Sequence, residues 1–187
     1  VNFTGGASSA LGITNASNQN YALLGMGGYN YDGNHNSDIN VTAGAGGINF
    51  TGGGGNPAAT NQGNQNFALL GNGGTGSRGN HVGDITVSAI AGGSIVFQGG
   101  TAREGYVQIG HGGWDADQPN GSGVGDLGNT GAINVSTVGG GDISFLAGTN
   151  YRSWSSIGHG GHATNGEHSG DITVNSSGAI TFTAGQL

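Results

Sequence analysis

Short runs of alternating apolar and polar residues recur along the whole chain. Near the end, Ile172–Val174 is followed by a Ser- and Gly-containing turn and then by Ile180–Thr183. Such runs, rich in Ile, Val, Thr and Phe and bounded by Gly and Ser, predict β-strands. The same pair of runs occurs in three earlier places, where the first run begins after Asp38, after Asp84 and after Ala132. The sequence therefore predicts stacked copies of one small unit.

Two columns of aromatic residues define the unit. The first recurs at intervals of 47, 47, 48 and 37 residues, at Phe3, Phe50, Phe97, Phe145 and Phe182. The second lies between these, at Tyr21, Phe67, Tyr106 and Trp154. Each unit thus holds three strand-like phrases. The spacing places inserted loops at 15–20, 61–66 and 115–126, confined to fixed joints as a solenoid permits.

We therefore expect an all-β chain in which each unit forms one coil of a parallel β-helix with three faces. About four coils with loop insertions would stack, and the five Phe side chains of the first column would form a ladder inside the tube. Two alternatives remain open: each unit makes two smaller coils, or the strands form a sandwich. We expect a single domain, 1–187, composed of repeats 1–47, 48–94, 95–142 and 143–179 and a partial copy, 180–187.

Glycine makes up 45 of the 187 residues, without a three-residue period. Gly-Gly pairs follow the second aromatic phrase in every repeat, at 27–28, 73–74, 112–113 and 160–161. Solenoid corners need positive φ or close backbone approach, which glycine permits. The alternative, a phosphate-binding loop, requires a Lys and a following helix. The chain has no Lys, so we interpret these pairs as corners.

The charge balance limits the classes of partner that the chain is expected to bind. Ten acidic residues face only three basic ones, Arg78, Arg103 and Arg152, and the net charge is -7. Nucleic acids and anionic membrane surfaces attract clustered Lys and Arg, so neither is an expected partner. The absence of Cys excludes disulfides and thiolate metal sites. No segment is long and apolar enough to span a bilayer, and we expect no membrane insertion.

Three polar columns are candidate sites. One holds His35, His81 and His168, with Asn129 in the third repeat; another holds Asp38, Asp84 and Asp171, with Ala132 in the third. Together they suggest metal binding or a pH-sensitive ladder, but Asp before a strand more often bonds turn N–H groups, which we favour. The third column holds Met26, Asn72, His111 and His159. These types share little coordination chemistry, so we expect them on a face of the solenoid.

The insertion in the third repeat has the composition of a Ca²⁺ loop. Asp115, Asp117 and Asp126 would supply oxygen ligands around Gly-containing turns. The spacing misses the helix-loop-helix pattern by one residue and gives at best one broken copy of the nonapeptide calcium repeat. We favour an acidic surface loop with no ion, and expect no cofactor.

Some phrases point to a known family. Ile109–Gly113 and Ile157–Gly161 both read Ile-Gly-His-Gly-Gly, and Gly166–Val174 follows the second of them. These phrases resemble the repeats of very large bacterial surface proteins similar to filamentous haemagglutinin adhesins. The resemblance implies a right-handed parallel β-helix, a location outside the cell or on its surface, and a fibrous role. It implies no particular receptor.

The two ends of the sequence suggest how a fibre would grow. Val1–Gly6 aligns in phase with Ile180–Gly185, and the chain starts in mid-phrase without Met. We therefore expect a processed product or a piece of a longer chain. Open ends of a solenoid expose unpaired strand edges. Our hypothesis is end-to-end stacking, with Ile180 and Phe182 of one copy meeting Val1 and Phe3 of the next, which builds an open filament.

Two other function classes deserve weight. Parallel β-helices also serve as polysaccharide-degrading enzymes, and Arg103, Arg152 and Glu104 mark the one candidate groove. An active site is normally a local violation of a repeat, and these repeats are regular, so we expect no enzyme. The other class is a glycan-binding adhesin module. Its candidate aromatic side chains are Tyr29, Tyr31, Trp114 and Trp154.

Overall fold

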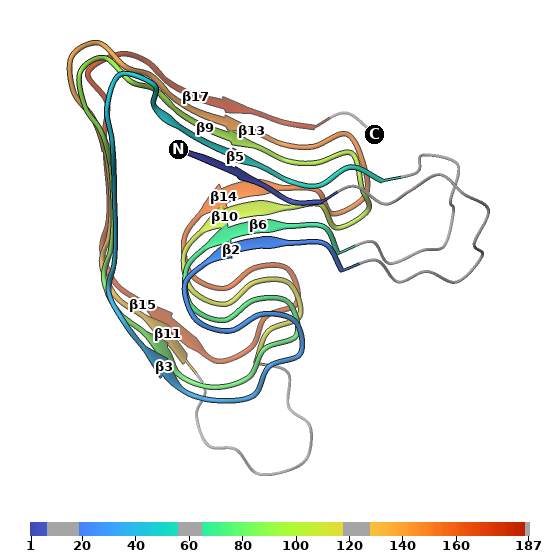
Figure 1. The fold of residues 1–187 in the computed structure, drawn as a ribbon. Helices are drawn as coiled ribbons and strands as arrows, with labels where there is room; N and C mark the ends of the chain where they lie inside the picture. Colours follow the sequence, from blue (N-terminus) through green and yellow to red (C-terminus); the bar gives the residue numbers. More distant parts are fainter. Residues whose placement is uncertain (7–18, 56–64, 118–127, 186–187) are drawn as a thin grey trace.

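The computed structural model describes residues 1–6, 19–55, 65–117 and 128–185. In these ranges the chain is all-β, with seventeen short strands and no helix. Every strand pairing is parallel. Figure 1 shows the successive repeats as nested outlines of nearly the same shape. This architecture confirms the prediction of parallel sheets and is consistent with a parallel β-helix or solenoid.

Four sheets, here named A to D, are built from equivalent strands of successive repeats. Sheet A contains β1 (Asn2–Thr4), β5 (Ile48–Thr51), β9 (Ile95–Gln98), β13 (Ile143–Leu146) and β17 (Ile180–Thr183). Sheet B contains β2 (Ala22–Leu24), β6 (Ala68–Leu70), β10 (Val107–Ile109) and β14 (Ser155–Ile157). Sheet C contains β3 (His35–Asn36), β7 (His81–Val82), β11 (Gly128–Thr130) and β15 (Glu167–Ser169). Sheet D contains β4 (Ile39–Ala43), β8 (Ile85–Ala89), β12 (Ile133–Thr137) and β16 (Ile172–Asn175).

Each repeat contributes one strand to each sheet, and all pairings join one repeat to the next. The register pairs residues of the same type in neighbouring repeats: Ile39 pairs with Ile85, and Phe50 pairs with Phe97. This pairing favours one coil per repeat over two smaller coils or an antiparallel sandwich. The prediction of three strands per repeat was wrong, because sheet C supplies a fourth. Its strands span two or three residues, too few to show an alternation in the sequence.

The apolar residues form two clusters, one on either side of sheet B. The larger lies between sheets A, B and D and includes Phe50, Phe97, Ile85 and Leu70. The smaller holds Phe67, Leu69 and Tyr106, with Trp114 and Trp154 packed against it. All three residues of β6 are fully buried as a result. Trp114, which the sequence places in a loop, is therefore partly buried in this second cluster.

The first aromatic column is a continuous stack of rings. Successive centroids from Phe3 to Phe182 lie 4.8, 5.0, 5.0 and 4.7 Å apart, and the rings are within 8° of parallel. The second column stacks in the same way from Tyr21 through Phe67 and Tyr106 to Trp154. Such stacking adds roughly 0.5–1.5 kcal/mol per pair beyond the burial of area. Both ladders thus bind each repeat to its neighbours.

Candidate assembly interface

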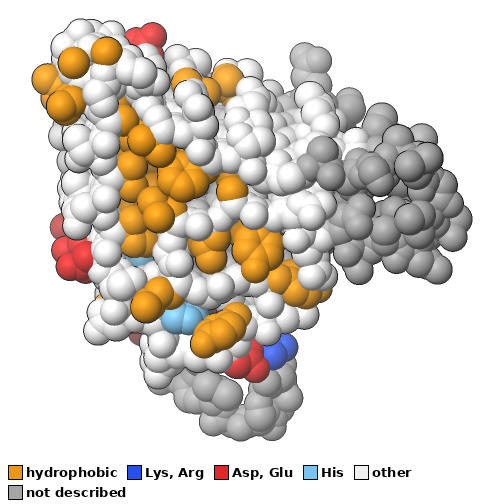
Figure 2. Space-filling model, in the orientation of Figure 1, with side chains coloured by type: hydrophobic (Ala, Val, Ile, Leu, Met, Phe, Trp, Pro, Cys, Tyr) orange, Lys and Arg blue, Asp and Glu red, His pale blue; other side chains and the backbone are white. Residues whose placement is uncertain are grey.

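Apolar side chains on or beside the outermost strands of the stack are exposed to solvent. Phe182 in β17 is 66% exposed, whereas Phe97 in the middle of the same ladder is fully buried. Val1, beside β1, and Ile180, in β17, are also exposed. On the side drawn in Figure 2, apolar side chains gather in a band and the visible charged side chains lie at its rim. The four residues predicted as assembly ends thus lie on or next to the edge strands of sheet A.

The number of strands limits how two copies of the chain can meet. Sheet A has five strands and sheets B, C and D have four each. Suppose first that β1 of a second copy pairs with β17 of the first. Strands β2, β3 and β4 of the second copy then lie two strand spacings from β14, β15 and β16 of the first copy, and each of these sheets has a gap of one strand. If those three sheets join directly instead, β1 and β17 compete for one position. Counted over the described strands, either arrangement of two copies leaves a gap or a clash in at least one sheet.

The column of Met26, Asn72, His111 and His159 joins consecutive repeats; we call it the staple column. The backbone N–H of Met26 donates to Asn72 Oδ1 at 3.0 Å, that of Asn72 to His111 Nδ1 at 2.9 Å, and that of His111 to His159 Nδ1 at 3.1 Å. The side chains of Asn72, His111 and His159 also reach a carbonyl of the preceding repeat, and Asn72 Nδ2 donates to Ser37 O at 3.1 Å. His111 Nε2 lies 2.8 Å from Gly83 O, and His159 Nε2 lies 2.9 Å from Gly131 O.

Their expected place on a solenoid face was therefore wrong for two members. Asn72 and His111 are fully buried, and His159, in the last repeat, is half-buried. Asn and His share little as metal ligands. They do share an acceptor at the δ position, Oδ1 or Nδ1, and a second nitrogen that can donate, Nδ2 or Nε2, which is what this bridge requires. Since Nδ1 accepts an N–H and Nε2 faces a carbonyl, these imidazoles are neutral, with the proton on Nε2.

Burial keeps the interior imidazoles uncharged. Desolvation lowers the pKa of His111 to about 4, against an opposing effect of the Gly83 carbonyl. Desolvation also lowers the pKa of His81 to about 4, helped by the nearby His35 and His111. Desolvation is also the main cause that lowers the pKa values of His35 and His159. The protein interior therefore favours a neutral His ladder at pH 7.

The Asp column bonds forward along the stack. Asp38 Oδ1 accepts the backbone N–H of Asp84 at 2.8 Å, and Asp84 Oδ1 accepts that of Ala132 at 2.8 Å. As favoured from the sequence, these carboxylates accept backbone N–H bonds, and the donors belong to the next repeat. Asn34 accepts the N–H of Asn80 in the same manner. The exposed polar columns thus reinforce contact between repeats.

The His column of sheet C and the predicted calcium residues meet at Asn129. His35 Nδ1 lies 3.0 Å from His81 Nδ1, and Asn129 donates to both His168 Nδ1 and Asp117 Oδ2. Asp117 is buried, its Oδ1 accepts the N–H of Gly79, and desolvation raises its pKa. Both of its oxygens thus bind protein donors. Across the described ranges no group of three His, Asp or Glu side chains is arranged to hold a metal, and Asp126 lies outside those ranges.

Two of the three Arg side chains surround one buried carboxylate. Arg103 Nε and Arg152 Nη1 lie 3.6 and 3.7 Å from Glu104 Oε1, and the Glu104 side chain is 4% exposed. Both guanidinium groups also lie over the ring of Tyr151, at 5.1 and 4.7 Å from its centroid. The groove marked by these residues in the sequence is thus a packed ion cluster. Its carboxylate is withdrawn from solvent.

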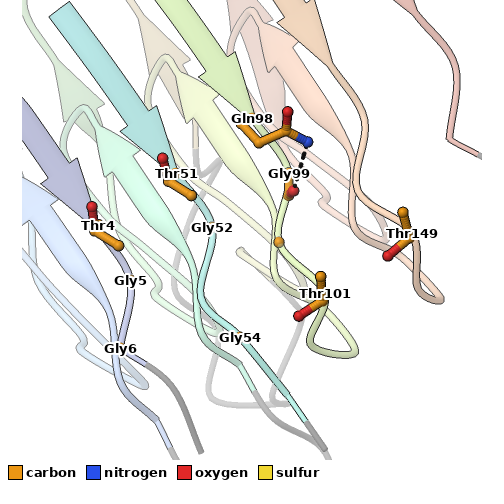
Figure 3. A pocket seen from close by; sticks show the side chains of 11 residues that line it. Thr4, Gly5, Gly6, Thr51, Gly52, Gly54, Gln98, Gly99, Thr101 and Thr149 are labelled. Carbon is orange, nitrogen blue, oxygen red and sulfur yellow. Dashed lines mark hydrogen bonds between the residues drawn. The ribbon is translucent and has the colours of Figure 1, made fainter. Parts of the chain in front are cut away.

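A hollow with Thr and Gly walls runs across several repeats beside the end of sheet A. Thr4, Thr51, Gln98, Thr101 and Thr149 provide its side chains, and the rest of the wall is glycine backbone (Figure 3). The amide of Gln98 donates to the carbonyl of Gly99 at 3.1 Å. The lining residues that the structure describes are all uncharged. They form a neutral surface in which Gln98 stands where the first two repeats have Thr4 and Thr51.

The chain was compared with models of protein families, with curated proteins and with solved structures, and none of the three comparisons finds a match. No helix among the described residues has the length and apolar character needed to cross a membrane.

Proposed function

We propose that this chain is a section of the shaft of an extracellular bacterial filament or adhesin, in which stacked β-repeats supply length and stiffness. The observation that carries the proposal is the in-register stacking of like residues from repeat to repeat. The interior Phe and Ile ladders, the staple bonds and the outer Asp bonds all join one repeat to the next along the axis of the stack. Each repeat is held by its two neighbours, which is the organisation of a rod.

The surface suits a long rod outside the cell. Sheet D directs Asn40, Thr86 and Asn134 outward, while the alternate residues Ile39, Ile85 and Ile133 are buried. With three basic residues and no Lys, the chain avoids binding to polyanions. Growth continues along the stack wherever a further repeat of matching register pairs with β14 to β17. The partner at that edge is therefore more of the same repeat.

The experiment lengthens the chain. One, two or three extra copies of residues 147–183 are inserted after Thr183, where the pairing of Leu146 with Thr183 keeps the register. Small-angle X-ray scattering should show a rod that lengthens by about 4.8 Å per added repeat at constant cross-section. A cross-section that widens with each copy, or added repeats without β-structure in circular dichroism spectra, would contradict a shaft function.

A further inference from the structure

The staple column follows one rule through the first three repeats. In each of them, one backbone N–H and one backbone C=O are bonded by a side chain that comes from the next repeat. For the third repeat these groups are His111 N–H and Gly131 C=O, and both bond to His159. The equivalent groups of the fourth repeat are His159 N–H and Gly170 C=O. No later side chain in the described part of the chain supplies their staple.

The staple is needed because the backbone bends at this point. Gly110 and Gly112 flank His111 with φ of 143° and 87°, a conformation that L-residues rarely adopt. The carbonyl of His111 still accepts the N–H of Gly160 at 2.8 Å, but its own N–H bonds to a side chain. A buried N–H without an acceptor is costly, so a neighbouring repeat must provide one at each level.

A second copy of this chain does not meet that requirement. Its first repeat carries Met26 at the staple position. The Met thioether is a weak acceptor and has no donor, so it would leave both groups of the fourth repeat without partners. The extra strand β17 also prevents sheets B, C and D from joining when β1 pairs with β17. Both observations disfavour simple head-to-tail stacking of copies.

We infer that the edge formed by β14 to β17 selects its partner: a further parallel β-repeat with Asn or His at the staple position, and not the Met26 repeat of a second copy. The inference rests on the proposed shaft function and deepens it by naming the chemistry of the next layer. Asn and His are the two types that already act as staples here, at Asn72, His111 and His159.

The test uses the full chain with one added copy of residues 147–183 after Thr183. Three versions differ only at the copy of His159, which is kept as His or replaced by Asn or by Met. Amide hydrogen exchange at His159 is followed by NMR, with the unextended chain as reference. The His and Asn versions should slow exchange of the His159 amide by about tenfold or more relative to the Met version. Their thermal unfolding midpoints should also be higher than that of the Met version.

The possible results distinguish a failure of the staple inference from a failure of the proposed shaft function. If the Met version protects the His159 amide as well as the His and Asn versions do, the staple does not select the partner and the inference is overturned, while the shaft function stands. If the added repeat forms no β-structure in any version, axial stacking itself is wrong, and the proposed function fails with it. Protection in the His and Asn versions alone supports both.

Discussion

At the residue scale, the staple column shows why both Asn and His occur at one position of the repeat. Asn72 and His111 differ in size and acidity, yet each bonds one N–H and at least one C=O of the preceding repeat. Metal coordination would distinguish these residues, whereas bridging two backbone groups does not. The sequence displays the column, but the bent backbone around its Gly neighbours is visible only in three dimensions.

The neutral His residues predict a loss of stability in mild acid. His81 and His111 have pKa values near 4 in the folded chain and near 6.5 when unfolded, so the unfolded state binds more protons between these pH values. The free energy of unfolding should therefore fall as pH drops from 6.5 towards 4, by at most about 3 kcal/mol for each of the two residues. Urea unfolding at a series of pH values measures this fall.

The control for this prediction is His111→Asn. Asn keeps the staple, as Asn72 shows, but does not titrate, so the variant should be nearly as stable as the parent at pH 7 and lose less stability on acidification. Asp117 acts in the opposite direction, because burial raises its pKa. The parent and the variant both contain Asp117, so the difference between their pH slopes reports on His111. An unchanged pH slope in the variant would contradict the assignment to His111.

At the scale of elements, the sequence predicted the strands of sheets A, B and D and missed those of sheet C. Sheets A and D follow runs in which every second residue is buried, as Ile85, Val87 and Ala89 are in β8. Strand β7, His81–Val82, is too short to display such a period, so the fourth sheet had no signal. In β6 all three residues are buried because the chain folds back over the outer face of sheet B. That second cluster depends on loop paths, which alternation does not encode.

The Phe ladder gives a test with an internal comparison. Phe97 is fully buried between Phe50 and Phe145, and Phe182 is largely exposed at the end of the same stack. Phe97→Ala should lower the free energy of unfolding by about 3–5 kcal/mol, and Phe182→Ala by less than about 1 kcal/mol. Chemical denaturation of the two variants checks this. Equal losses would show that the ladder is not organised from a buried centre to an open end.

At the scale of the whole molecule, repetition replaces a thick core. The composition is only 33% hydrophobic, but nearly identical layers align their Phe and Ile side chains into shared ladders. The coarse architecture followed from the sequence for this reason: a repeat displays each structural position several times, so chance patterns cancel. The fifth strand of sheet A also corresponds to a feature of the sequence, because the fifth Phe of the first aromatic column lies in the partial copy 180–187.

The last prediction removes a whole layer. Deleting residues 95–142 joins Ser94 to Ile143, so that β13 can pair with β5, β14 with β6, and β16 with β8 in the existing like-on-like register. Because each repeat contacts only its neighbours, the shortened chain should keep its β-structure and unfold at a lower urea concentration with a smaller m-value. Deleting 95–117 alone is the control: it removes β9 and β10 but keeps β11 and β12, so sheets A and B lose one level that sheets C and D retain. If the two deletions behave alike, the layers are not interchangeable units, and an account built on axial repetition does not hold.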